Sequence, residues 1–298
     1  MKQLKFSIID ILNLIFVFII FLFYLAAFPQ TPYKWQPPLI LFLLSALVLS
    51  AIYVRTYKNK GKRAQIFLFS YPVIFLFSIF ETFFMILPYF NSSRYDEVLN
   101  NLDFSMLGVY PTVWIEQFHA PWFTDLLYLL YLFYFPMPLF LLVYLYKKHR
   151  FVDLDKVVFA YLLTYYVSYI IYFFVPAVGP RFNETLLKLQ SIKELNGIFL
   201  ATPIRELINF LEPNKFDAFP SLHTAILTIT MLGAYYYYRK LFRIFIPVAA
   251  GILISLVYCR YHYVIDMIAG FTVAVMAFYT AQLLYEYLRR KLATVPFV

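Results

Sequence analysis

Eight long apolar runs constrain this chain more than any other feature of its sequence. A helix that crosses a bilayer needs roughly 20 mainly apolar residues, and the runs approach that length at residues 9–28, 36–54, 65–90, 122–146, 157–176, 222–238, 244–258 and 265–288. The composition agrees, because only 14% of the residues are charged, whereas soluble domains carry about 25%. We therefore expect an all-α integral membrane protein with about eight transmembrane helices.

The first apolar run lies where a secretory signal peptide would also lie. Asp10 and Asn13 interrupt it, however, and no small-residue cleavage site stands out. We therefore expect this run to be a retained membrane helix.

The basic residues indicate how the helices are oriented. The net charge is +9, and short, dense basic runs lie at residues 55–63 (RTYKNKGKR) and 147–150 (KKHR). With helices alternating in direction, these runs fall on the same side as both termini, so the positive-inside rule places the termini in the cytoplasm. This distribution explains the positive charge without a nucleic-acid partner. The lone cysteine, Cys259, rules out an intramolecular disulfide and a cysteine-rich metal site.

In this orientation the more polar chemistry gathers on the outer face. The outer loops are residues 91–121, 177–220 and 259–264. Three of the four histidines lie in or beside these loops: His119, His223 and His262.

Acidic residues within the apolar runs point to the same end of the bundle. Glu81 lies in the outer half of the third run, Asp125 opens the fourth and Asp266 opens the eighth. A charge in mid-membrane costs at least ~2.5–3.5 kcal/mol, so such residues usually face a polar cavity or a partner. Two interpretations stay open for Glu81 and Asp125: a link between helices, or a polar pocket. The pocket would also include Glu116 and His119.

The segment at residues 181–213 has a different pattern. Leu and Ile recur there at mixed three- and four-residue spacing, which predicts one or two amphipathic helices in the membrane interface. Such a segment either packs along the interface or covers a lipid-facing pocket as a lid, and the sequence leaves both roles open.

Two stretches carry the residues typical of catalysis, FPSLH at residues 219–223 and HYVID at residues 262–266. His262 and Asp266 are four residues apart, so on a helix they share a face and the carboxylate can hydrogen-bond the imidazole. That bond would fix the tautomer and leave the other ring nitrogen free to attack.

Two histidines and one carboxylate suit phosphoryl transfer without a metal. One imidazole attacks phosphorus and forms a covalent intermediate, while the other protonates the leaving oxygen. The charge of the phosphate must also be neutralised. Arg181 is the leading candidate for this role, followed by Lys215 and Arg260. Arg260 could alternatively be an interfacial residue that faces lipid headgroups. Ser221 and the N-terminus of the helix after it would add hydrogen-bond donors.

A metal site is the alternative chemistry, with His119, His223, His262 and Asp266 as zinc or iron ligands. The sequence holds no compact ligand motif such as H-E-x-x-H, and the pairing of His262 with Asp266 is explained without a metal. We therefore expect neither a metal nor another cofactor.

At these residues the sequence resembles the type-2 phosphatidic acid phosphatase superfamily of membrane phosphatases and phosphotransferases. Its three signatures are K-x6-R-P, P-S-G-H and S-R-x5-H-x3-D. Pro220, Ser221 and His223 match the second signature, and Leu222 stands in place of its glycine.

The third signature is matched at its two ends. Ser255, His262 and Asp266 occupy the family positions, but Leu256 stands where the family has arginine. The first signature is absent as written, although GPR at residues 179–181 lies in its place with proline and arginine in reverse order.

FPSLH and HYVID, with GVYPTVWIEQF at residues 108–118, are more similar to the branch of inositol phosphorylceramide synthases and their bacterial relatives. The resemblance covers the third to eighth apolar runs. It implies a six-helix phosphatase-like core at residues 65–298, with two additional helices at residues 1–64, in a single membrane domain.

The resemblance also implies a phosphohistidine mechanism. His262 would be the nucleophile, Asp266 its orienting carboxylate and His223 the general acid and base. Arg181 or Arg260 would replace the missing family arginine.

The expected function is that of a lipid phosphatase that cleaves a lipid phosphate or pyrophosphate at the outer face. One alternative is a phosphotransferase that moves a phospho-headgroup, such as phosphoinositol, to an alcohol acceptor. A second is a non-enzymatic lipid transporter. Low Gly content with abundant Phe, Tyr and Lys is typical of a bacterial chain, so we expect a bacterial inner membrane protein with an extracytoplasmic active site.

Overall fold

The computed structural model describes residues 4–57, 61–211, 216–292 and 294–296. The regular elements in these residues are helices, as the apolar runs predicted, and one isolated parallel bridge joins Ala177 and Asp217. Seven helical segments in this part of the chain are long and apolar enough to cross a membrane. The chain is therefore all-helical, with the apolar segments of an integral membrane protein.

The chain divides into two compact units. Unit 1 consists of Met1–Ser92, Leu145–Tyr166 and Ala277–Val298, and unit 2 consists of Ser93–Tyr144 and Val167–Met276. The boundary expected at residue 64, between additional helices and core, lies inside unit 1. The division into two additional helices and a six-helix core therefore stays a prediction.

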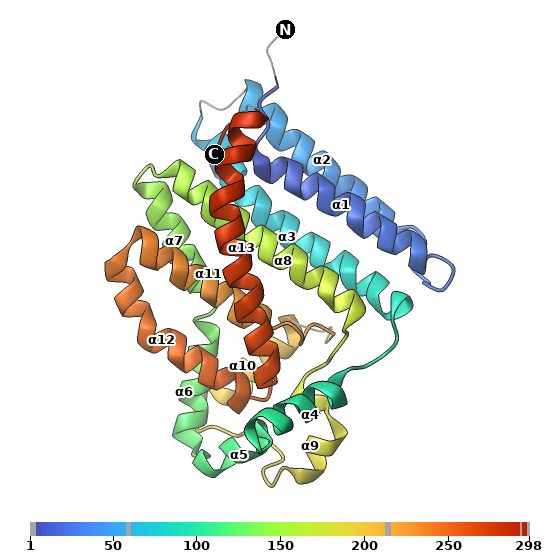
Figure 1. Ribbon diagram of the computed structural model, residues 1–298, viewed down its shortest axis with the longest axis vertical. Coiled ribbons are helices and arrows are strands. Elements are labelled where there is room, and N and C mark those ends of the chain that lie inside the picture. Colours follow the sequence, from blue (N-terminus) through green and yellow to red (C-terminus); the bar gives the residue numbers. More distant parts are fainter. Residues whose placement is uncertain (1–3, 58–60, 212–215, 293, 297–298) are drawn as a thin grey trace. The chain divides into compact units, whose positions relative to one another are not determined.

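Three long helices form most of unit 1: α1 (Ile8–Ala27), α2 (Gln36–Tyr57) and α3 (Lys62–Phe90). Each packs against the other two, and α1 and α2 run side by side (Figure 1). Parts of three further helices complete the unit: the end of α7 (Pro136–Lys147), the start of α8 (Phe151–Phe174) and the end of α13 (Val264–Lys291).

Polar side chains buried between these helices form the Asp10 cluster, which consists of Asp10, Arg55 and Tyr71. Ser7 starts α1 with a capping box, in which its backbone N–H donates to the Asp10 carboxylate. The same carboxylate accepts hydrogen bonds from the Arg55 guanidinium and the Tyr71 hydroxyl. Because all three side chains are buried, the charges of Asp10 and Arg55 compensate each other away from water.

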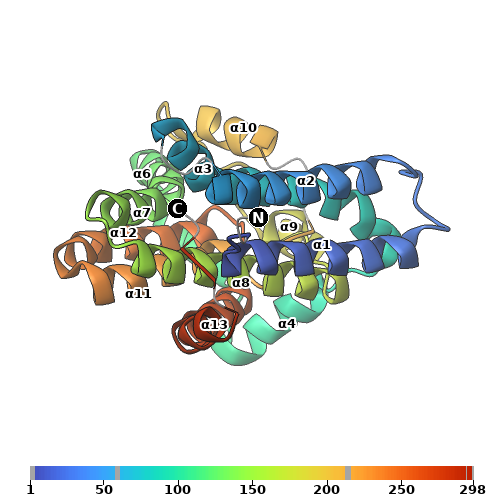
Figure 2. The same cartoon turned by 90° about the horizontal axis from the view of Figure 1, so that it is seen from above.

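Unit 2 holds the shorter helices. Its elements are α4 (Asp96–Leu107), α5 (Pro111–Trp114), η1 (Ile115–Phe118), α6 (Pro121–Leu132), η2 (Pro180–Phe182), α9 (Glu184–Leu189), α10 (Ala201–Leu211), α11 (Leu222–Tyr237) and α12 (Arg239–Tyr258), with the remaining parts of α7, α8 and α13. α12 packs against both α6 and α11, and α10 packs against α6. Figure 2 shows α11 and α12 side by side.

Two of the expected membrane spans differ from the structure. The run at residues 122–146 is divided into α6 and α7 by a turn at residues 133–135. Pro136 begins α7, and a proline cannot continue a helix without losing a hydrogen bond and clashing with the preceding turn. α11 has 16 residues, which is short of the roughly 20 that a span needs. Because α6 and α7 together still form one apolar segment of 27 residues, Pro121–Lys147, only α11 drops out, and seven described segments rather than eight have the length of a span.

The amphipathic helices expected at residues 181–213 correspond to α9 and α10. The inner face of α10 buries Ile204 and Ile208 against Leu127 of α6. Its outer face and the loop before it leave apolar side chains uncovered, with Phe199 70% and Phe210 81% exposed. α10 therefore presents one apolar face to the protein and a second one outward.

Candidate active site

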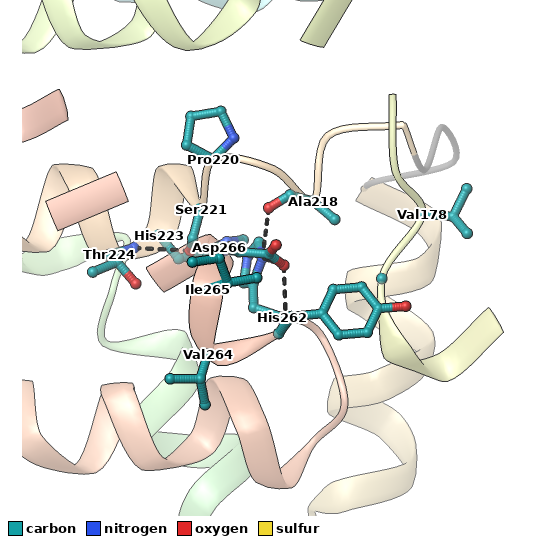
Figure 3. Close-up of polar contacts among 12 residues, drawn as sticks. Val178, Ala218, Pro220, Ser221, His223, Thr224, His262, Val264, Ile265 and Asp266 are labelled. Atoms are coloured by element: carbon teal, nitrogen blue, oxygen red, sulfur yellow. Dashed lines mark hydrogen bonds and ion pairs between the residues drawn. The ribbon is translucent and has the colours of Figure 1, made fainter. Parts of the chain in front are cut away.

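His262 lies in the turn between α12 and α13, and Asp266 lies in the first turn of α13. The Nδ1 atom of His262 is 3.4 Å from Oδ2 of Asp266 and 3.0 Å from the carbonyl oxygen of Ala218. In Figure 3 this carbonyl points at the His262 ring. Because a carbonyl can only accept, Nδ1 carries the proton, and Nε2 keeps its lone pair. The i,i+4 approach expected from the sequence is thus present, with Ala218 as the nearer acceptor.

His223 faces His262 from the first turn of α11. The Ser221 hydroxyl caps this helix by accepting a hydrogen bond from the backbone N–H of Thr224 (3.2 Å). The Nδ1 atom of His223 lies 3.0 Å from Nε2 of His262. Two imidazoles that are 39 residues apart in the sequence therefore meet nitrogen to nitrogen. We call His223 and His262 the histidine pair.

Two glycines allow the backbones around the histidine pair to meet. A Cβ atom on Gly270 would lie 2.2 Å from the carbonyl oxygen of Ser221, so only glycine lets α13 touch the start of α11. Gly179 has φ +91°, and a Cβ atom there would lie 2.6 Å from the carbonyl oxygen of Tyr261. Next to it, the N–H of Arg181 donates to the carbonyl of Arg260 (3.1 Å). The loop of Arg181 is therefore fixed against the turn that carries His262.

Three arginines surround this turn, and they differ in how their charges are compensated. The Arg181 guanidinium lies 4.3 Å from the Tyr261 ring centre and donates to the side chain of Asn209. Arg205, on α10 one turn before Asn209, donates to the Leu195 carbonyl and is hydrogen-bonded to Tyr128. Neither guanidinium has a carboxylate within ion-pair distance in the part of the chain that the structure describes. Both therefore keep an uncompensated positive charge.

Arg260 differs from the other two, because it pairs with Glu116 at 2.7 Å. Its guanidinium also donates to the carbonyls of Ile192 and Lys193. Arg260 has φ +63°, in the left-handed region that non-glycine residues rarely adopt. Its hydrogen bonds hold the turn before His262 in this conformation.

Two of the acids expected near a pocket, Glu116 and Asp125, hold loops. Glu116 accepts hydrogen bonds from the N–H groups of Ser191 and Ile192. Asp125 accepts four, from the backbone N–H groups at residues 198–201 that lead into α10. Glu116 and Asp125 therefore position the segment that carries Arg205.

Three further residues were expected near the site: His119, Glu81 and Lys215. His119 is half-buried, and its Nε2 has no hydrogen-bond partner among the described residues. Glu81 is exposed on α3 and belongs to unit 1, whereas the histidine pair belongs to unit 2. Lys215 lies outside the described residues.

Two aspartates on α4 hold the site loops and were not singled out in the sequence. Asp96 accepts from the N–H groups of Val178 and Gly179, just before Arg181. Asp103 accepts from the first two N–H groups of α13, at 2.8 Å each. Burial raises the pKa of both carboxyls, and these hydrogen bonds oppose the rise. The seven-residue spacing of the two acids, which places them on one helix face, was the available signal.

Aromatic rings surround His223. The Tyr131 hydroxyl lies 2.6 Å from its Nε2 atom, and the ring centre of Tyr134 lies 4.6 Å from that of His223. Tyr131 stacks on Tyr261 with ring centres 4.7 Å apart. No sequence signal marked Tyr131, because it is one of 28 tyrosines and lies inside an apolar run.

The electrostatic setting favours an uncharged His262. Burial lowers its pKa well below the ordinary value of 6.5, and Arg181, together with His223 whenever that ring is protonated, lowers it further. A neutral imidazole has a lone pair available for attack on an electrophile. The histidine pair can therefore supply a nucleophile and, opposite it, a proton carrier.

A metal centre has no ready set of ligands in this part of the chain. Among the described residues, no three or more His, Cys, Asp or Glu side chains are grouped so that they could hold a metal ion. His119 is not part of the hydrogen-bonded group that contains His223 and His262.

Comparison with protein families gives one match. The model of the PAP2 superfamily matches residues 100–280, which is more than half of the chain. The matched region includes the histidine pair and Asp266. The chain matches neither a curated protein nor a solved structure.

Proposed function

Because the chain belongs to the PAP2 superfamily, whose members are generally phosphatases or phosphotransferases, we propose that it is a lipid phosphatase acting through a phosphohistidine intermediate. Membership and the apolar helices together make it a phosphatase-type or phosphotransferase-type membrane enzyme. The substrate in this proposal is a lipid phosphate or pyrophosphate, and no metal takes part.

The observation that carries the proposal is the 3.0 Å approach of His223 Nδ1 to His262 Nε2. A phosphoryl group would enter between these nitrogens and move the rings apart. His262 then forms the P–N bond as the bond from phosphorus to the lipid oxygen breaks. His223, protonated beside the anionic phosphate, gives its proton to that oxygen.

The second step restores both histidines. Neutral His223 takes a proton from water as the water oxygen attacks phosphorus, the P–N bond breaks, and inorganic phosphate leaves. Asp266 and the Ala218 carbonyl support the positive charge on His262 while it carries the phosphoryl group, because both lie within 3.4 Å of its Nδ1–H.

Arg181 and Arg205 are the proposed phosphate ligands. Both hold uncompensated charges next to the turn of His262, and guanidinium groups bind phosphate oxygens in a bidentate way. Arg260 is assigned to the structure of the turn, because Glu116 already neutralises it. Ser221 contributes through the N-terminus of α11, where free backbone N–H groups favour an anion.

The outward apolar face at α10 supports a lipid as the substrate. Phe199 and Phe210 are among the most exposed aromatic side chains, and a helix with such a face lies in the membrane interface. From the basic runs we further propose cytoplasmic termini and an extracytoplasmic site in a bacterial inner membrane.

A phosphotransferase is the second candidate. The FPSLH and HYVID stretches, with Leu222 in place of glycine, favour it because they resemble the inositol phosphorylceramide synthase branch. The chemistry would be the same except that an alcohol, rather than water, attacks the phosphohistidine.

The test is to incubate the purified protein with a lipid phosphate labelled at phosphorus, with and without a long-chain alcohol and with and without EDTA. We expect labelled inorganic phosphate in every case. Label in a new lipid when the alcohol is present would favour the transferase. Strong inhibition by EDTA would contradict the metal-free mechanism.

A further inference from the structure

The histidine pair is part of a longer hydrogen-bonded chain that reaches into α6. Tyr131 is fully buried, and its hydroxyl lies 2.6 Å from the Nε2 atom of His223. The opposite ring nitrogen of His223, Nδ1, faces His262. Tyr131 therefore holds His223 by the nitrogen that does not face the proposed reaction.

The direction of each hydrogen bond in this series follows from its last acceptor, the Ala218 carbonyl. The Ala218 carbonyl can only accept, so Nδ1 of His262 is the donor and Nε2 is an acceptor. Nδ1 of His223 then donates to that acceptor, which leaves Nε2 of His223 to accept from Tyr131. A single polarity therefore runs from the phenol to the carbonyl.

The packing of Tyr131 fixes where its hydroxyl lies. Its ring stacks on Tyr261, with 24° between the planes, and it is buried with Leu127 and Leu256 in one hydrophobic cluster. A histidine ring, by contrast, turns readily about its second side-chain torsion. The rigid partner in this contact is Tyr131.

We propose that Tyr131 is a positioning residue that keeps the Nδ1–H of His223 aimed at the leaving oxygen. This inference rests on the proposed function. A phenol suits the task in both protonation states, because it donates to neutral His223 and accepts from the protonated ring. Without it, His223 would turn and present its proton elsewhere.

The first experiment compares two leaving groups in the full-length Tyr131→Phe variant. A lipid alkoxide needs a proton to leave, whereas nitrophenolate hardly does. General acid catalysis typically contributes 10²–10⁴-fold, so we expect kcat on a long-chain lipid phosphate to fall at least about 10-fold with KM little changed. On nitrophenyl phosphate the fall should be within about 3-fold, because positioning of the acid matters less there.

Tyr134→Phe is the matched control, since it removes a hydroxyl from a neighbour that contacts His223 through its ring. We expect it to leave the ratio of the two rates unchanged. An equal loss on both substrates in Tyr131→Phe, or no loss on either, would overturn the inference.

The second experiment does not depend on turnover. The chain has four histidines, so ¹⁵N spectra of labelled protein can be assigned with single His→Gln variants. We expect His223 to be the Nδ1–H tautomer in the wild type and a mixture of tautomers in Tyr131→Phe. An unchanged tautomer would overturn the inference. If the spectra are as expected but the wild type hydrolyses neither ester, the proposed function is wrong, and the contact between Tyr131 and His223 is still established.

Discussion

The two units each bury a polar cluster, and the clusters differ in how completely their charges are paired. In the Asp10 cluster of unit 1, the carboxylate of Asp10 is shared by a guanidinium, a phenol and a backbone N–H. In unit 2, Oδ1 of Asp266 is buried without a hydrogen-bond partner among the described residues. Arg181 and Arg205 there have only uncharged partners. Unit 2 therefore keeps unused capacity for hydrogen bonds and for an anion.

This difference indicates different roles. A buried ion pair with all its hydrogen bonds made has nothing left to offer a ligand, and breaking it leaves an uncompensated charge. In the buried site of unit 2, the histidines are neutral and the arginine N–H groups have capacity for further acceptors. An anion that binds there would supply these acceptors. Substitutions in the Asp10 cluster should therefore change the stability of the fold, and substitutions around the histidine pair should change turnover.

The largest effect is expected for His262→Ala. With the nucleophile gone, kcat/KM on a lipid phosphate should fall on the order of 10⁴-fold or more, as it does when other covalent nucleophiles are removed. The thermal unfolding of the detergent-solubilised protein should change little by comparison.

His149→Ala is the control for this substitution, because His149 lies in the basic run between α7 and α8. It should retain wild-type turnover. A loss of only a few-fold in His262→Ala would make the nucleophile assignment wrong, and retained lipid movement without hydrolysis would favour a transporter.

The reverse result is expected for Asp10→Ala. It leaves the buried Arg55 charge without its carboxylate, which typically costs about 3–5 kcal/mol of folding stability. The measurement is the midpoint of unfolding, compared with kcat per folded molecule, which should stay near the wild-type value.

A double variant, Asp10→Leu with Arg55→Met, sharpens this comparison. Replacing both charges by apolar side chains of similar size is often close to neutral, so most of the lost stability should return. If the double variant is as unstable as the single one, the pair is not what stabilises unit 1.

The helices and the contact of His262 with Asp266 could be predicted from the sequence, because their signals are local. Apolar runs predict helices, and an i,i+4 spacing places Asp266 beside His262 whatever the rest of the fold does. The break between α6 and α7 was also local, since Pro136 marks it, but the long apolar run around it masked the break.

The partners that come from other helices could not be predicted. Asp10 was interpreted only as an interruption of the first run, and Arg55 only as part of a basic topology signal. Their contact depends on how α1 and α2 are rotated about their axes, which a single sequence does not specify. The same applies to Tyr131 and Arg205, which meet the site through the packing of α6 and α10.

Arg205→Gln tests the assignment of the uncompensated arginines. A hydrogen bond to a charged group contributes about 1.5–3 kcal/mol, so loss of a phosphate ligand should raise KM for a lipid phosphate roughly 10-fold or more. Steady-state kinetics in mixed micelles would measure it.

Arg260→Gln is the matched comparison, because Arg260 is already paired with Glu116. We expect it to lower the unfolding temperature more than Arg205→Gln does and to raise KM less. The opposite order would exchange the roles of the two arginines.

The smallest effect concerns the pH profile. Burial, the charge of Arg181 and any protonation of His223 lower the pKa of His262, whereas its bond to the Ala218 carbonyl raises it. Only the neutral ring can attack, and a lowered pKa delays protonation as the pH falls. The acid limb of kcat/KM, which reports the free enzyme, should therefore lie below pH 6.5, the ordinary pKa of histidine.

Arg181→Gln makes this profile diagnostic. Removing that positive charge removes one of the causes that lower the pKa of His262, so the pKa should rise and the acid limb should move to higher pH. The position of the limb is independent of how much activity the variant loses, so it can be measured even when turnover is weak. A limb that stays in place or moves to lower pH would show that Arg181 does not act on His262, and would weaken its assignment as the phosphate ligand beside the nucleophile.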